Sequence, residues 1–306
     1  IDWTSADVSI GTLTKTFTAG ESSTIALNQT VLAPVVSVTK EIPQTGVTSN
    51  SWDVNSTTEN YTRLDSAYAT TLDFNRYDVS SASYTQSFSV AGQETTPQGV
   101  AFNTDGTKMF VVGSTGDDVN EYDLSIGFDI ATAVYSQAFS VSAQEAAPVG
   151  IAFNNDGTKM FIVGVIGIDV NEYDLSTGFD VSTAVYSQNF SVSAQEPIPT
   201  GLTFNTDGTK MFIVGSSGDE VNEYDLSTAW DVSTASYLQN FRVAVQGEFT
   251  PRSVFFKPDG LKMYIVGSTR DIVFQYDLST AWNVSTASYT DPTTEYFYVG
   301  TEDANP

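Results

Sequence analysis

A five-residue motif, Asp-Gly-Thr-Lys-Met, recurs at a nearly constant interval along this chain. It occupies residues 105–109, 156–160 and 207–211, and a fourth copy with Leu in place of Thr occupies 259–263. The copies begin at residues 105, 156, 207 and 259, so the repeat is about 51 residues long. A period near 50 residues in strand-type sequence is typical of β-propellers and related arrays.

The second copy shows what one repeat contains. Residues 150–153 are a short apolar run, and the Asn-Asn-Asp-Gly sequence at 154–157 favours a tight hairpin turn. Residues 160–164 are apolar at every position, as in a strand covered on both faces, and 170–175 form a third strand-like run. Residues 186–192 alternate with period two and predict a half-exposed outer strand.

These patterns predict an all-β fold, a β-propeller of four-stranded blades with at least four blades. The Met-containing strands, such as Met211 to Val214, are expected in the buried middle of each blade. A β-solenoid is the alternative, although its repeats are usually shorter.

The outer-strand pattern occurs once more often than the Asp-Gly hairpin. It begins at Tyr84 and recurs until a fifth copy from Tyr289 to Val299, whereas the hairpin occurs four times. Residues 297–306 align with 139–148, the segment that leads into the next repeat. We expect an incomplete array with more blades in a parent protein. The alternative is a four-bladed ring that the extra outer strand closes.

The first part of the chain does not carry the repeat. Residues 1–72 are rich in Ser and Thr, with strand-like alternation from Thr12 to Phe17 and an apolar stretch from Val31 to Val38. About 70 residues can barely bury a core of their own. We therefore expect a small β module or anchoring arm at 1–72 and the propeller at 73–306.

Composition excludes several classes of function. The chain has 306 residues, 12 Lys and Arg against 37 Asp and Glu, and a formal net charge of −25. Such a charge disfavours nucleic-acid binding and contact with an anionic membrane. There is no apolar run long enough for a transmembrane helix, so membrane insertion is not expected. The absence of Cys excludes disulfides and thiol chemistry and suits an extracellular protein.

The acidic residues predict hydrogen bonding rather than catalysis. Histidine is absent, which removes the usual general base and most transition-metal sites. A carboxylate pair could still hydrolyse glycosides, but a catalytic pair should occur once and not in every repeat. Most acids recur at equivalent positions, in turns or at strand ends: Asp105, Asp156, Asp207, Asp259, Asp123, Asp174, Asp225 and Asp277. Asp118, Glu220 and Glu248 break the pattern but are scattered, so no catalytic residue is assigned and no enzymatic activity is expected.

Calcium is the most plausible ion, because it prefers carboxylate and carbonyl oxygens. The pairs Asp117-Asp118 and Asp219-Glu220 could each supply two carboxylates. No EF-hand or Gly-rich nonapeptide spacing is present, so a solvated hairpin is the preferred interpretation of both pairs. No other cofactor is expected.

An aromatic residue stands at the same place in each repeat, before Asp or Asn and then Val or Ile. It is Phe128, Phe179, Trp230 or Trp282. Trp230 and Trp282 are candidate glycan contacts. The alternative, favoured by the recurrence, is that each ring anchors a loop against the blade edge.

The fourth repeat departs most from the others and carries a local cluster of positive charge. The candidate partner-contact residues are Arg242, Arg252, Lys257, Arg270 and Phe274. Arg270 replaces a Gly and Phe274 replaces an Asn that the other repeats share. A subunit contact is one interpretation, and drift in a single repeat is the other.

The repeat resembles propeller-like repeats of marine bacteriophage proteins, some of which look like virion appendage or fibre proteins. The likeness lies in Phe-Asn-Thr-Asp-Gly-Thr-Lys-Met-Phe-Ile-Val-Gly, Val-Asn-Glu-Tyr-Asp-Leu-Ser-Thr and Phe-Ser-Val-Ser-Ala-Gln-Glu, and it covers about 73–306. The Asp-Gly hairpin is also similar to seven-bladed lactonase-type propellers. Without histidine to match an enzymatic site there, no catalytic residue carries over.

The phage resemblance implies a non-enzymatic structural protein of the virion, as capsid decoration, baseplate or tail fibre. Its partners would be other virion proteins or host-surface components. It would act in a multi-copy assembly at the virion surface or outside the cell. The alternative function is a secreted bacterial adhesin or glycan-binding propeller.

Overall fold

The computed structural model describes residues 35–38, 70–73, 77–289 and 296–302. The chain divides into two compact units, residues 1–76 and 77–306. In the first unit, β1 (Val35–Val38) pairs antiparallel with β2 (Thr70–Asp73). The strand expected from Thr12 to Phe17 lies outside the described residues.

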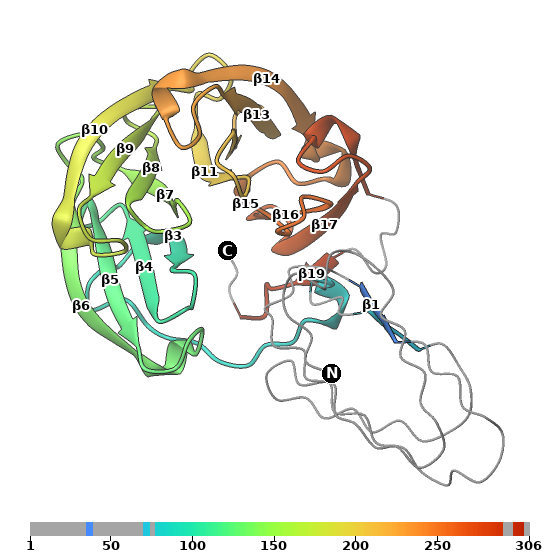
Figure 1. The fold of residues 1–306 in the computed structure, drawn as a ribbon, viewed down its shortest axis with the longest axis horizontal. Coiled ribbons are helices and arrows are strands. Elements are labelled where there is room, and N and C mark those ends of the chain that lie inside the picture. The colour runs from blue at the N-terminus through green and yellow to red at the C-terminus, as the bar shows by residue number, and fades with distance from the viewer. Residues whose placement is uncertain (1–34, 39–69, 74–76, 290–295, 303–306) are drawn as a thin grey trace, which may run out of the picture. The chain divides into compact units, whose positions relative to one another are not determined.

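The second unit is a four-bladed β-propeller, which confirms the predicted fold class (Figure 1). Blade 1 contains β3 (Pro97–Phe102), β4 (Lys108–Gly113), β5 (Asp118–Leu124) and β6 (Ala133–Ser140). Blade 2 contains β7 (Pro148–Phe153), β8 (Lys159–Gly164), β9 (Asp169–Leu175) and β10 (Ala184–Ser191). Blade 3 contains β11 (Pro199–Phe204), β12 (Lys210–Gly215), β13 (Glu220–Leu226) and β14 (Ala235–Arg242).

Blade 4 differs from the others in its outer strand. It contains β15 (Pro251–Phe256), β16 (Lys262–Gly267) and β17 (Ile272–Leu278). Two short strands, β18 (Ala287–Ser288) and β19 (Tyr296–Tyr298), both pair with β17 where the other blades have one continuous strand. In every blade the paired strands are antiparallel, and in blades 1 to 3 neighbours in sequence are neighbours in the sheet.

The second strand of each blade is apolar on both faces because other blades cover it. In β12, Met211, Phe212, Ile213 and Val214 are fully buried, as the sequence predicted. Phe212 and Val214 join a core with residues of blade 4, and Met211 and Ile213 join one with residues of blade 2. The hydrophobic core therefore runs between blades, and each blade is stabilised by its neighbours.

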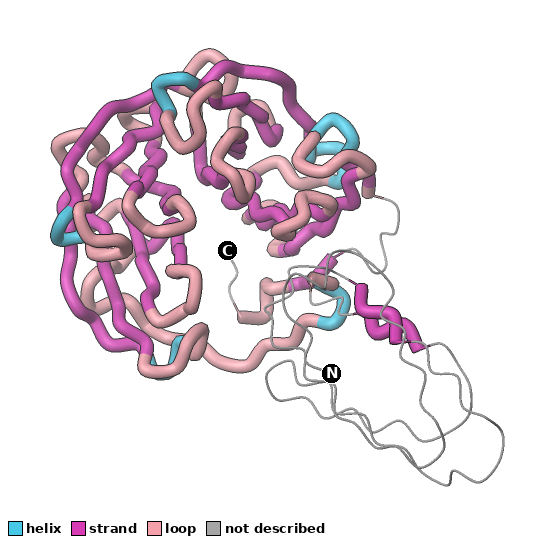
Figure 2. Tube along the Cα trace, in the orientation of Figure 1, coloured by secondary structure: helices cyan, strands magenta, loops and turns pink. Residues whose placement is uncertain are grey.

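A short 3-10 helix precedes each outer strand, where the sequence indicated only a polar loop (Figure 2). These helices are η2 (Ile130–Thr132), η3 (Val181–Thr183), η4 (Val232–Thr234) and η6 (Val284–Thr286). An Asp or Asn caps each one by accepting the N–H two residues later, which such short polar side chains do well. Two more are η1 (Val79–Ser81) and η5 (Val243–Gln246). None of the helices in the described ranges has the length and hydropathy needed to cross a bilayer.

The extra copy of the outer-strand pattern, which begins at Tyr84, does not add a strand to blade 4. Within the described residues, 82–90 form no strand, and blade 4 already carries β18 and β19 on its outer side. The structure therefore does not support the closing of a four-bladed ring by this segment.

Candidate ligand-binding face

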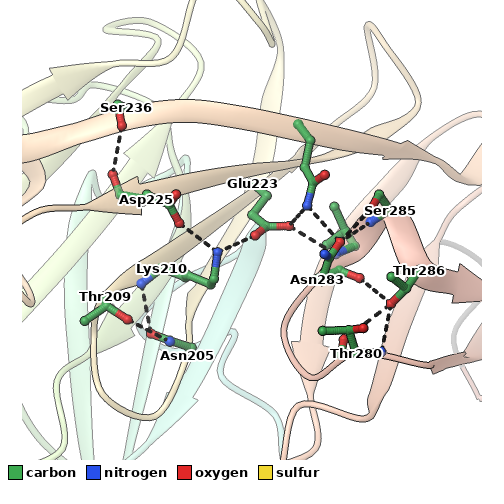
Figure 3. Close-up of polar contacts among 12 residues, drawn as sticks. Asn205, Thr209, Lys210, Glu223, Asp225, Ser236, Thr280, Asn283, Ser285 and Thr286 are labelled. Carbon is green, nitrogen blue, oxygen red and sulfur yellow. Dashed lines mark hydrogen bonds and ion pairs between the residues drawn. The ribbon is translucent and has the colours of Figure 1, made fainter.

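A hydrogen-bonded network crosses each junction between blades, and Figure 3 shows the one that joins blade 3 to blade 4. The Lys210 Nζ contacts Glu223 Oε1 at 2.5 Å and Asp225 Oδ1 at 2.7 Å. Glu223 Oε2 accepts from the Gln239 side chain at 2.8 Å and from the Val284 backbone N–H of blade 4 at 3.1 Å. Glu223 is fully buried, so each of its oxygens needs such a partner.

The same network occurs at the junctions after blades 1 and 2. Glu121 and Glu172 occupy the place of Glu223 and accept from the first helical residue of the next blade, at 3.1 and 3.0 Å. Burial opposes a charged lysine here. Nevertheless, the hydrogen bonds that each ammonium donates to two carboxylates raise the pKa of Lys108, Lys159 and Lys210. Repetition in three blades identifies this carboxylate-rich network as structural, in agreement with the sequence analysis.

The Asp-Gly hairpins lie at one end of the blades, which we call the hairpin face. The side chain of Asp207 accepts from the Thr209 N–H at 3.0 Å, and Gly208 has a φ of 72°. The Trp230 ring covers this glycine so closely that a Cβ would lie 2.2 Å from the ring. The repeated aspartates are therefore turn hydrogen bonders, as predicted.

The recurring aromatic residues anchor their loops, as the sequence analysis favoured. Trp230 is half-buried against Phe161 and Phe204, with ring centroids 6.2 and 5.2 Å away. Trp282 is placed in the same way in blade 4, against Phe212 and Phe256. The structure gives these rings a packing role, and glycan contact through them stays an untested prediction.

The opposite end of the blades carries the turns between the second and third strands. We define the turn face as residues 114–117, 165–168, 216–219 and 268–271, with the loops that precede the first strands at 95–96, 146–147, 197–198 and 249–250. A fully buried glutamate supports each turn. Glu145, for example, accepts the N–H groups of Ala147, Ile166 and Gly167 at 2.7, 3.2 and 2.9 Å. Its side chain passes where a Cβ of Gly164 would be, so the strand must end in glycine.

The first three copies differ on the turn face and agree on the hairpin face, whereas the fourth copy departs from them on both. The hairpins at 103–108, 154–159 and 205–210 change at their second residue only. The matching turns read Ser-Thr-Gly-Asp-Asp, Val-Ile-Gly-Ile-Asp and Ser-Ser-Gly-Asp-Glu at 114–118, 165–169 and 216–220, and only the glycine is shared. Exposed turns tolerate more sequence variety than the strands that they join, and binding residues are often carried on such loops.

Unpaired buried polar atoms also gather at this end. Within the described residues, buried side-chain oxygens or nitrogens without a hydrogen-bond partner belong to Asp117, Asn222, Glu248 and Asp271. Asp117 and Asp271 lie in turns, and Glu248 supports the turn of blade 4. Asn222 lies on β13, two residues after the turn-side end of that strand. An unpaired buried acceptor costs about 1–3 kcal/mol, so such groups call for water, an ion or a ligand.

Blade 1 adds an aspartate whose protonation equilibrium is shifted. Burial is the main cause that raises the pKa of Asp118, and the nearby charges of Glu94 and Asp117 add to it. Burial also opposes ionisation of Glu94, but hydrogen bonds from Thr96, Thr115 and Gly116 outweigh it and lower that pKa. Two carboxyl groups with opposite pKa shifts thus lie around one turn. The sequence analysis passed over Asp118 as scattered, although the Asp-Asp doublet at this position is peculiar to blade 1.

The two candidate calcium pairs both lie on or beside the turn face. Asp117 and Asp219 occupy the turns and are partly buried, and Asp118 and Glu220 open the following strands. Glu220 accepts from Asn240 at 2.5 Å. Among the residues that the structure describes, no three His, Cys, Asp or Glu side chains converge into a metal cluster. A cation at either pair would therefore draw most of its ligands from backbone carbonyls and water.

The basic residues of the fourth repeat do not form one patch. Arg252 and Arg270 lie at the turn-side end of blade 4, where Arg252 donates to Ser268 at 3.3 Å. Lys257 lies at the other end, in the hairpin, and pairs with Asp259 at 2.8 Å. Phe274 is buried with 2% of its surface exposed, because it joins the core around β17. Phe274 is therefore unsuited to partner contact, and Lys257 belongs to a different surface from Arg270.

Comparison with known proteins finds only distant structural likeness. No family model and no curated protein matches the chain. Among solved structures, a putative 6-phosphogluconolactonase from Bacteroides uniformis has a TM-score of 0.45 and 14% identity, covering 66% of this chain and 55% of that one. The putative 6-phosphogluconolactonase of Bacteroides fragilis gives the same TM-score and coverages at 15% identity.

The periplasmic gluconolactonase of Pseudomonas aeruginosa gives a TM-score of 0.44 at 13% identity, covering 63% of this chain and 53% of that one. The described propeller thus spans about half the length of each of these structures. Similarity at this level concerns the propeller fold and transfers no activity.

These neighbours correct the function expected from the sequence. The expected role was a non-enzymatic structural protein of a virion, and the propellers found by structure carry the names of lactonases. The virion role is therefore withdrawn. The expectation that the chain is not an enzyme is not supported either. An enzymatic role is not shown by the likeness.

Proposed function

We propose that the protein is a ligand-binding β-propeller whose turn face holds a positively charged ligand. The main support is that Asp117 and Asp271, in two different turns, each have a buried carboxylate oxygen without a hydrogen-bond partner. Such an oxygen gains most from a cation or a charged donor. The other acids on or beside this face, Asp118, Asp219 and Glu220, and the net charge of −25 favour the same sign of ligand.

Calcium and a small diamine are the two simplest ligands of this class. Calcium takes six to eight oxygen ligands in a flexible geometry, which carboxylates, backbone carbonyls and water can supply together. A diamine would instead donate hydrogen bonds to two separate carboxylates. Calcium would also use backbone carbonyl oxygens, and a diamine would not. Titration with each compound separately shows which of them binds.

Thermal unfolding in the presence of each probe tests the proposal. Calcium chloride or 1,4-diaminobutane should raise the Tm, because a ligand at 100 times its Kd stabilises the folded state by about 2.7 kcal/mol. D117N and D271N should weaken that rise. D105N is the matched control, because Asp105 is an exposed aspartate of the hairpin face. Absence of any rise with both probes, or equal loss of the rise in D105N, would contradict the proposal.

A second candidate function, acid–base hydrolysis at the same face, is favoured by Asp118. A carboxyl group with a raised pKa beside one with a lowered pKa is the usual arrangement of a general acid and its partner. In this candidate Asp118 donates the proton, so activity should fall as pH rises above its pKa. Turnover on a panel of esters, lactones and glycosides, lost in D118N, would support it. Turnover that survives in D118N would exclude Asp118 as the acid.

A further inference from the structure

Residues 77–94 match the part of the repeat that contains the 3-10 helix, the outer strand and the turn after it. Tyr77-Asp-Val-Ser-Ser matches Phe179-Asp-Val-Ser-Thr, and 84–90 match 186–192 with Tyr, Gln, Phe, Ser and Val in the same places. The 3-10 helix forms in both segments. Yet 82–90 do not form the outer strand that follows η3 in blade 2, because no described strand lies beside them to pair with.

The helix η1 is joined to blade 4 as each helix is joined to the blade before it. In blades 1 to 3, the buried Glu of the third strand accepts the first helical N–H of the next blade. In blade 4 the equivalent residue is Gln275, whose Oε1 accepts the N–H of Val79 at 3.2 Å. By this contact, η1 occupies the position that follows blade 4 around the ring.

Residues 82–90 are joined to blade 1 as each outer strand is joined to the blade after it. Gln86 Nε2 donates to Asp129 Oδ1 at 2.9 Å, and the equivalent bonds between later blades measure 2.7 to 2.8 Å. The Phe88 ring meets Tyr122 edge-on at 5.7 Å, the same distance as at the next two junctions. The segment therefore lies in the place of an outer strand between blade 4 and blade 1.

The face of blade 1 toward this position is exposed where the other blades are covered. Val100 on β3 is 59% exposed, whereas its counterparts Ile151, Leu202 and Val254 are 6%, 6% and 3% exposed. Those three pack against the preceding blade. Val100 occupies the equivalent place in its blade, and none of the described residues covers it as the preceding blade covers its counterparts.

The face of blade 4 toward the same position is less covered than that of blade 3. Val266 and Val273 are half-buried, although Val214 and Val221, their counterparts in blade 3, are fully buried under blade 4. Tyr264, which is 8% exposed and donates its hydroxyl to the Tyr77 backbone oxygen, stands where Phe110, Phe161 and Phe212 each pack in a tilted arrangement against a Phe of the next blade at 4.4 to 4.5 Å. The described residues offer Tyr264 no such ring from a following blade.

We propose that the ring has a fifth position, and that its occupant is a three-stranded antiparallel β-sheet with the sequence of this repeat. The occupant takes residues 82–90 as its outer strand. A Phe on its first strand packs against Tyr264, and its apolar second strand covers Val100. A Glu on its third strand accepts from Gln86 and from the Ile130 N–H, for which no partner is found among the described residues. The counterparts of that N–H, in η3, η4 and η6, all have such a partner.

Two details shape this interface. Val299 donates to Asp271 O at 2.8 Å, as Val141 and Val192 donate to Asp117 O and Ile168 O in the segments that precede blades 2 and 3. Ser253 stands where Gly99, Gly150 and Gly201 bring first strands into close contact, as a Cβ there would lie 2.7 to 2.9 Å from its nearest neighbour. The first strand of the occupant must therefore lie slightly farther from blade 4 than the blades lie from each other.

Two measurements on the full chain test whether the position is vacant. Hydrogen exchange should be at least tenfold faster at the amides of 83–90 than at 133–140 and 184–191, which are paired outer strands. V100D should leave the Tm nearly unchanged, whereas I151D, the matched change in blade 2, should lower it by several degrees. Equal protection of 83–90, or equal losses in V100D and I151D, would overturn the proposal. Protection that grows with protein concentration would assign the position to a second copy of the chain and also overturn it.

Adding the occupant tests its identity. A copy of residues 149–175, the three inner strands of blade 2, is appended after Pro306, which aligns with Pro148. Exchange at 83–90 should slow at least tenfold, and V100D should now lower the Tm as I151D does. The same extension with F153D and E172A in the added copy is the control and should give neither effect. An extended chain that is folded but keeps fast exchange at 83–90, or a control that protects equally, would refute the sequence-specific fit.

Discussion

Lys210 and Lys262 occupy the same place in successive blades, but only Lys210 faces a buried carboxylate. Lys210 bridges Glu223, which is fully buried, and Asp225, which is half exposed. In blade 4 the glutamate is replaced by Gln275, and Lys262 pairs with Asp277 alone at 2.7 Å. The pair of lysines therefore separates the contribution of a buried ion pair from that of an exposed one.

Replacing each lysine by methionine keeps most of the side-chain volume and removes the charge. K210M leaves Glu223 charged, buried and without its cation, which should cost about 3–5 kcal/mol of unfolding free energy. K262M removes a partly exposed pair, with no buried carboxylate left behind, and should cost about 1 kcal/mol. Urea denaturation of both variants measures the difference. Equal losses would show that the buried glutamate does not need the lysine.

Stability should fall steeply above about pH 10, because two kinds of group lose protons there more readily in the unfolded chain. Burial raises the pKa of Tyr173, Tyr224, Tyr264 and Tyr276, and hydrogen bonds raise that of the three network lysines despite their burial. In the unfolded chain the pKa is about 10 for Tyr and about 10.4 for Lys. Because the folded pKa is higher, these groups contribute their full stabilisation at pH values below the unfolded pKa. It is lost as pH rises toward the folded pKa.

Urea unfolding at pH 8 and at pH 11 measures this loss. A lower midpoint at pH 11 is expected for the wild type. K210M, which lacks one of the titrating lysines, should show a smaller change between the two pH values. An unchanged midpoint in the wild type would show that these groups titrate alike in both states.

For single residues, the sequence predicted the roles of those that recur in each blade and missed the roles of those that occur in one blade. Asp207 follows from turn chemistry, and the burial of Met211 follows from an apolar run, because both effects act within a few residues. The unpaired oxygens of Asp117 and Asp271 depend on which neighbours surround each turn. A single sequence does not contain that information. Phe274 was misjudged for the same reason, since its unusual identity marks a core substitution and not a surface contact.

In blades 2 to 4, the loop that carries the recurring aromatic residue packs against the preceding blade through that ring. Phe179 in blade 2 is half-buried between Phe110 and Phe153, with centroids 6.3 and 5.4 Å away. Phe128 in blade 1 meets Phe102 at 5.7 Å and is 59% exposed. The two loops have the same fold. Among the described residues, the Phe128 loop has no preceding blade to pack against, whereas the Phe179 loop packs against blade 1.

F179A and F128A form a matched pair that measures the contribution of the neighbouring blade. F179A removes apolar contacts on two blades and should cost about 1–3 kcal/mol. F128A removes contacts on one blade and should cost less than about 1 kcal/mol. Thermal or urea unfolding of the two variants checks the order. A greater cost for F128A would contradict the packing described for these loops.

At the scale of elements, the four-strand repeat was readable from the sequence, because alternation and hairpin residues determine it locally. The 3-10 helices in the loop at 176–183 and in the equivalent loops of the other blades were not readable from the sequence. A capped helix of three residues leaves no periodicity to detect. The division of the last outer strand into β18 and β19 was indicated only by the small insertion after Tyr289.

For the whole molecule, the propeller presents two chemically different faces. In blades 1 to 3 the hairpin face repeats one sequence almost unchanged, and its aspartates are engaged in turn hydrogen bonds. The turn face varies from blade to blade and has the unpaired buried acceptors nearby. The blade fold was predictable from the repeat. The antiparallel strand order also places the hairpins and the turns at opposite ends, but the sequence alone does not show which polar atoms near the turn face are buried and unpaired.

The location of ligand binding is the most direct test of this view of the molecule. Amide chemical shifts of the isotope-labelled full chain are followed by NMR during titration with calcium chloride and, separately, with 1,4-diaminobutane. The shifts should be concentrated at 114–118, 165–169, 216–220 and 268–272, with the hairpins at 103–108, 154–159 and 205–210 unchanged. Shifts confined to the hairpins, or no shifts with either probe, would contradict the proposed binding face.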